Sequence, residues 1–257
     1  SRELPLFKIS FILVKDIKKY NFKDNFLKVG YKYSEITNEF CLFYNSKIYS
    51  SINKKIFLIG DIFDPYNPEF SNIDILNFLS KQNDLNRSLN RYAGRFVIFN
   101  LLEETIRVYN DSLAGHQVFY YFQNGNCAVS SSPYLLKKCF NEINPSLGTK
   151  KEFFNSKKLK NNQNAVIGDE TKYEGVNKLL ANHLLDLKNK TVNRFWPLVY
   201  KKNISLEEGT KKSEKLLKGI GERLKKQKER KPKDKESSTK KKNNNEKKLD
   251  DKNNVGN

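Results

Sequence analysis

Residues 95–130, RFVIFNLLEETIRVYNDSLAGHQVFYYFQNGNCAVS, contain several short apolar runs that are separated by turn residues. Aromatic and β-branched side chains dominate these runs, as is typical of strands. Glu103-Glu104 marks one tight turn, and Asn124-Gly125 is a strong signal for a two-residue hairpin. The runs predict four short strands, at residues 95–102, 105–109, 117–122 and 126–130. This part of the chain is therefore expected to form antiparallel sheet.

The sequence on either side of this stretch predicts further strands and a few helices. Ser71 and Asn72 resemble a helix cap, and Ser132-Pro133 opens another helix with proline at its first position. The predicted strands are residues 6–14, 39–44, 47–51, 55–62, 183–187 and 192–195, with Asn45-Ser46 and Asn189 as hairpin turns. The predicted helices are residues 72–79, 134–139 and 150–160. The first 200 residues thus read as a strand-rich α+β domain.

Composition limits the class of protein. The chain has 257 residues and a mass of 30.1 kDa, of which 37% are hydrophobic and 30% charged, with 18 Phe and 13 Tyr. That aromatic content can build a core, so wholesale disorder is excluded. No apolar run is long enough for a membrane span, and we expect no membrane association. Three cysteines without a CxxC motif argue against a disulfide framework or a zinc site and favour a cytoplasmic protein.

The net charge of +19 is unevenly distributed. About half of the excess lies after residue 200, where residues 228–257 are rich in Lys and Asn and almost free of apolar side chains. We expect this tail to be disordered and residues 201–227 to form a helical linker, weakened by Gly219 and Gly221. Without an aromatic residue to stack on bases, the tail is expected to bind nucleic acid, if at all, only through phosphates and without sequence preference.

Three segments together resemble the N-terminal part of asparagine synthetase-like proteins. YAGRFVIF at residues 92–99 resembles the family's (D/S)GxFAF strand, and YNDSLAGHQVFYY at 109–121 with VSSS at 129–132 resembles the hairpin that follows. Residues 167–187 and NRFWP at 193–197 resemble the element that links the two domains of the family. The resemblance implies a class II glutamine amidotransferase-like, Ntn-hydrolase fold over residues 1–200: two stacked antiparallel sheets between helical layers.

The resemblance also implies a glutaminase site, which this chain does not reproduce. Family members use an N-terminal cysteine as nucleophile, an Asn as oxyanion donor and an Asp that holds the glutamine amine. The corresponding positions here are Ser1, Ile59 and Ala93, while the neighbouring Gly60 and Gly94 are kept. We therefore expect a degenerate site without confident catalytic residues. An active amidohydrolase that uses Ser1 is the alternative from the enzyme class.

The remaining expectations concern parts of the family that this sequence lacks. No SGGxDS loop follows the linker, so we expect a truncated chain with no cofactor of its own; ATP and Mg²⁺ would belong to the missing synthetase domain. A second copy or a separate ligase subunit is the expected partner.

His116, His183 and Asp111 are interpreted as structural, Asp111 by fixing a turn. Trp196 is expected to pack on the strand at residues 183–187, or else to form an exposed patch with Phe195 and Tyr200.

Overall fold

Strand pairing arranges the described residues in two six-stranded sheets. The computed structural model describes residues 9–16, 23–145, 168–197 and 204–229. The order of the first sheet is β10 (Val176–Lys178), β8 (Phe119–Tyr121), β9 (Ala128–Ser130), β1 (Phe11–Lys15), β3 (Phe40–Tyr44) and β2 (Lys32–Glu35). The order of the second sheet is β12 (Thr191–Arg194), β11 (His183–Asp186), β7 (Ile106–Asn110), β6 (Ala93–Leu101), β5 (Ile56–Phe63) and β4 (Ile48–Ser50). All of these pairings are antiparallel.

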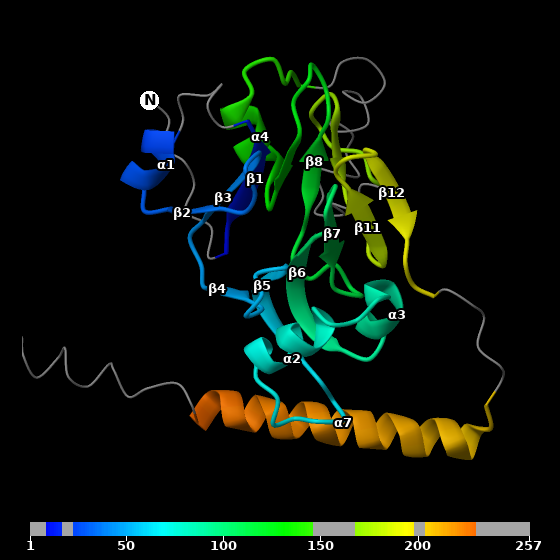
Figure 1. Ribbon diagram of the computed structural model, residues 1–257. Coiled ribbons are helices and arrows are strands. Elements are labelled where there is room, and N and C mark those ends of the chain that lie inside the picture. The colour runs from blue at the N-terminus through cyan, green and yellow to red at the C-terminus, as the bar shows by residue number, and fades with distance from the viewer. Residues whose placement is uncertain (1–8, 17–22, 146–167, 198–203, 230–257) are drawn as a thin grey trace, which may run out of the picture.

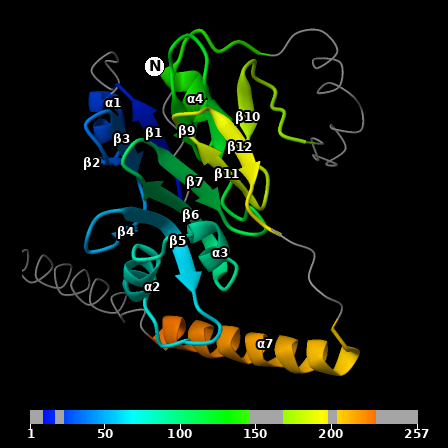
Figure 2. The same ribbon diagram turned by 45° about the vertical axis from the view of Figure 1, so that its right-hand side comes forward.

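Helices cover the outer face of each sheet (Figures 1 and 2). The first sheet packs against α1 (Lys23–Lys28) and α4 (Pro133–Cys139), and the second against α2 (Asn72–Leu79) and α3 (Leu85–Leu89). The helix starts follow the capping chemistry of the sequence. Ser71 and Asp74 form a reciprocal capping box at α2, and the Ser132 hydroxyl accepts the Tyr134 amide at α4.

Side chains alternate between the two faces of each strand, so the central strands contribute to three apolar layers. One layer lies between the sheets, and one lies between each sheet and its helices. In β5, Phe57 and Ile59 point between the sheets, whereas Ile56 and Leu58 point toward α2 and α3. β1 follows the same rule, because successive side chains of a strand face opposite sides of its sheet. Both faces of the central strands are thus buried, which explains their continuous apolar runs. The α+β class with two stacked antiparallel sheets flanked by helices is confirmed.

Several predicted turns are confirmed. Asn124 and Gly125 both have positive φ, as a two-residue turn of this kind requires, and they join β8 to β9. The turn at Glu103-Glu104 joins β6 to β7, and the late hairpin pairs β11 with β12.

The hairpin predicted at Asn45-Ser46 is wrong. β3 and β4 both exist, but β3 lies in the first sheet and β4 in the second. The chain crosses between the sheets at this point, because the neighbours of each strand are distant segments: β1 and β2 flank β3, and β5 pairs with β4.

One long helix, α7 (Leu206–Glu229), lies across the loop between β5 and α2 (Figure 1). Gly219 is buried there, so close to Pro65 that an added Cβ would stand 1.8 Å from its carbonyl oxygen. Lys226 pairs with Glu69 on the same loop. Gly219 was expected to weaken the helix. In the structure it instead permits the helix to pack against the loop that contains Pro65. The division of the chain into a domain, a helical linker and a tail, with boundaries at residues 200 and 227, stays a prediction. Three expectations lie outside the described residues: the helix at 150–160, the position of Tyr200 and the tail at residues 230–257.

Candidate functional site

The positions that match the glutaminase motif meet where β5 pairs with β6. Gly60 is opposite Phe96 and Gly94 is opposite Ile62, and their φ angles are +96° and +142°. A Cβ on Gly60 would lie 2.2 Å from the Arg95 carbonyl oxygen, and one on Gly94 would lie 2.2 Å from that of Asp61. Both glycines are therefore required by backbone conformation and by close approach of the strands.

The polar groups of that motif are missing from the same place. Ile59 is fully buried between the sheets, where it is opposite Val97. An isoleucine side chain has no hydrogen-bond donor, so it cannot stabilise an oxyanion. Ala93 begins β6 and is half-buried, and its methyl group cannot hold an ammonium. Ser1 lies outside the described residues. The structure thus brings Ile59, Gly60, Ala93 and Gly94 together as a strand framework.

Asp111 organises the loop that follows β7. Its carboxylate is 2% exposed and accepts the backbone amides of Leu113, Gly115, His116 and Phe96 at 3.0 to 3.3 Å. Four amide donors satisfy a buried charge that would otherwise be costly. The interpretation of Asp111 as a turn-fixing residue agrees with this geometry.

His116 lies on that loop beside Gly60. A Cβ built on Gly60 would stand 2.8 Å from its Nε2. Burial and the charge of Arg95 lower the pKa of His116, so the ring is neutral at pH 7. His116 lines a cleft of about 350 Å³ with Ser131 and Ser132. Ser131 Oγ already bonds the backbone of Phe11, and Ser132 Oγ caps α4, so neither hydroxyl is poised as a nucleophile.

The remaining single residues have structural surroundings. His183 Nδ1 lies 2.8 Å from the Ala181 carbonyl oxygen. Trp196 is half-buried and packs against the core layer beneath α2 and α3, next to Phe195, whose ring meets Tyr109 edge to face. All three cysteines are free thiols, and burial raises the pKa of Cys127 to about 12.

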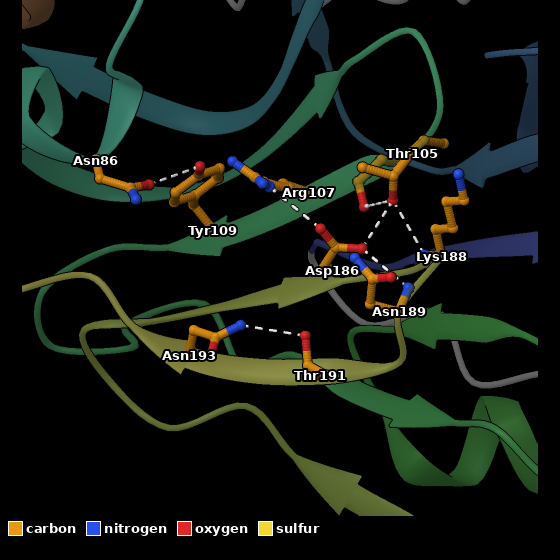
Figure 3. Close-up of polar contacts among 10 residues, drawn as sticks. Asn86, Thr105, Arg107, Tyr109, Asp186, Lys188, Asn189, Thr191 and Asn193 are labelled. Atoms are coloured by element: carbon orange, nitrogen blue, oxygen red, sulfur yellow. Dashed lines mark hydrogen bonds and ion pairs between the residues drawn. The ribbon is translucent and has the colours of Figure 1, made fainter.

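A polar pocket at the far end of β6 had no counterpart in the sequence interpretation. It has a volume of about 660 Å³ and lies between the loop that joins α2 to α3 and the turns that follow β6 and β11. Arg107 and Asp186 form an ion pair in it, with Nε and Oδ2 3.2 Å apart (Figure 3). These residues are 79 positions apart in the chain, and only the register of β7 with β11 brings them together.

The described residues hold neither a metal cluster nor a membrane-spanning helix. No group of three or more His, Cys, Asp or Glu side chains there could hold a metal ion. None of the helices in these ranges combines the length and apolar character that a membrane span requires.

Comparisons with known proteins give a remote structural likeness. No protein-family model matches the sequence, and no curated protein matches it. Among solved structures, the chain is similar to the glutamine phosphoribosylpyrophosphate (PRPP) amidotransferase of B. subtilis in complex with ADP and GMP. The identity is 9% and the TM-score 0.40, over 76% of this chain and 44% of that one. This chain therefore spans less than half of the length of that protein. The fold class rests on the strand pairing described above.

Proposed function

We propose that this chain is an asparagine synthetase-like glutaminase domain that has lost glutamine hydrolysis and works as a binding module. The three segments that resemble that family motivate the proposal. The kept glycines support it, because they hold β5 and β6 in close approach at the positions where the family has its site.

The observation that carries the loss of activity is the burial of Ile59. Its side chain is packed among apolar groups of both sheets, so no small movement would bring a donor to that place. Ala93 removes the anchor for the substrate amine as well. An enzyme that lacks an oxyanion donor typically loses a factor of about 10² to 10³ in rate from that change alone.

Partners and cofactors follow from the same proposal. ATP and Mg²⁺ would act on a synthetase domain with an SGGxDS loop, and this chain would associate with a second copy or with a separate ligase subunit that carries it. A cytoplasmic location fits the three free thiols.

The test is an ammonia-release assay with glutamine and the full chain. We expect a rate equal to the buffer blank. The Ile59→Asn variant should not restore activity, and it should unfold at lower denaturant concentration because a buried amide without partners costs roughly 1–3 kcal/mol. Ile59→Val is the matched control, with a small loss of stability and no polar group.

Ammonia release above the blank that disappears when the Ser1 amine is blocked would contradict the proposal. That result would instead establish the alternative, an amidohydrolase that uses Ser1 as its nucleophile.

A further inference from the structure

A row of polar side chains crosses the helix-covered face of the second sheet. Asn100 on β6 is opposite Arg107 on β7, which is opposite Asp186 on β11. The neighbouring row on this face consists of Ile98, Tyr109 and Leu184, which belong to the apolar core. A row of polar side chains on an otherwise apolar sheet face costs folding free energy unless the polar groups have hydrogen-bond partners.

Asp186 has its partners within the protein. Its carboxylate is 4% exposed and accepts Thr105 Oγ1 at 3.0 Å, the Asn189 amide at 3.1 Å and Arg107 Nε at 3.2 Å (Figure 3). Although burial alone would raise the pKa of Asp186, these hydrogen bonds outweigh it and lower the pKa. The carboxylate thus has three hydrogen-bond donors within the protein, and it holds the Arg107 side chain in place.

Arg107 and Asn100 retain capacity for a ligand. Arg107 has five N–H donors, of which Nε is held by Asp186, and its guanidinium also contacts Tyr109. Its side chain is 40% exposed and lines the pocket. Asn100 is only 9% exposed and lines the same pocket, yet its amide bonds to no other side chain or backbone group of the described residues.

The shape of the pocket suits a small molecule. A volume of about 660 Å³ lies within the usual range of ligand sites. Lys55 stands at its rim, whereas Lys188 is already paired with Glu104. Two further carboxylates line the pocket: Asp84, which caps α3, and Glu103. A guanidinium that is held in place, an amide that has no hydrogen-bond partner among the described residues and a lysine at the rim together present donors to an acceptor group, and the planar guanidinium matches a carboxylate.

We propose that this pocket binds a small carboxylic acid, with the carboxylate on Arg107 and Asn100 and with Lys55 at the entrance. The site lies at the other end of β6 from Gly94, so it goes beyond the proposed loss of glutaminase activity and does not depend on it.

The test is calorimetric titration of the full chain with succinate, L-glutamate and citrate, with succinamide as the uncharged control. We expect saturable binding of at least one acid and none of succinamide. Asn100→Asp should weaken the binding about tenfold or more, because it places a like charge beside the ligand. Asn193→Asp is the matched control: the same change on the exposed strand β12, outside the pocket, should leave binding unchanged.

A melting curve shows whether each variant is folded. If Asn100→Asp does not fold, Lys55→Glu on the exposed rim provides the same charge test and should also weaken binding. The proposal is overturned if no acid gives saturable heat up to about 10 mM, a weak affinity for a built site. It is also overturned if succinamide binds as well as succinate, or if the folded charge variants bind like the original protein.

Discussion

Alanine should have opposite effects at Gly219 and Gly221 of helix α7. Both are helix positions where alanine is intrinsically favoured over glycine by about 1 kcal/mol. At Gly221 an added Cβ meets no atom within 4 Å, so the variant should gain this amount. At Gly219 the Cβ would stand 1.8 Å from the Pro65 carbonyl oxygen, and about 1.2 Å of retreat is needed to reach even a tight contact of 3.0 Å.

That retreat would loosen every contact of the docked face. Ile220 and Leu216 line a cleft with Tyr66 and Tyr92, and Arg223 is 5% exposed on the same side of the helix. Overpacking of this kind typically costs 1–3 kcal/mol, so Gly219→Ala should be less stable than Gly221→Ala by about that amount.

Hydrogen exchange of the α7 amides and urea unfolding measure the difference. We expect increased protection of α7 in Gly221→Ala and decreased protection in Gly219→Ala. If both variants gain protection equally, α7 is not seated on Pro65 and the explanation of its buried glycine fails.

Two further predictions concern buried carboxylates. Asp186→Asn should lower the stability at pH 7 by about 2–3 kcal/mol, since a charged hydrogen-bond partner is lost. Because its native pKa is lowered, Asp186 contributes stability above about pH 4, and this contribution fades as the pH falls. The melting temperature of the variant should therefore depend less on pH below about 4 than that of the original protein. Identical pH profiles of the two proteins would contradict this. Asp111→Asn should cost about 2–3 kcal/mol in urea unfolding, because its amide can accept only some of the four backbone donors and its NH₂ faces the others. A loss below about 0.5 kcal/mol would show that the loop rearranges freely.

Local signals account for what the sequence predicted well. Asn124-Gly125 predicted its turn because the two consecutive positive φ angles of that turn favour these residues. Ser71 predicted a helix start because its side chain accepts the backbone amide of Asp74, only three residues along the chain. The apolar run at residues 55–62 predicted a strand, and the burial of both faces of β5 explains why that run is continuous.

The sequence by itself determined most of the strands, several helices with their caps, and the close-range turns, because these depend on backbone preferences and side chains within a few residues. The short elements α1, β2, α3 and β10 were not predicted. Tertiary structure alone decided that β3 and β4 separate into two sheets, since each strand takes its partners from distant segments. It also decided the polar row of Asn100, Arg107 and Asp186, because strand register selects which side chains become neighbours. The role of Gly219 arises in the same way: only docking against Pro65 turns a residue that weakens a helix into one that its packing requires.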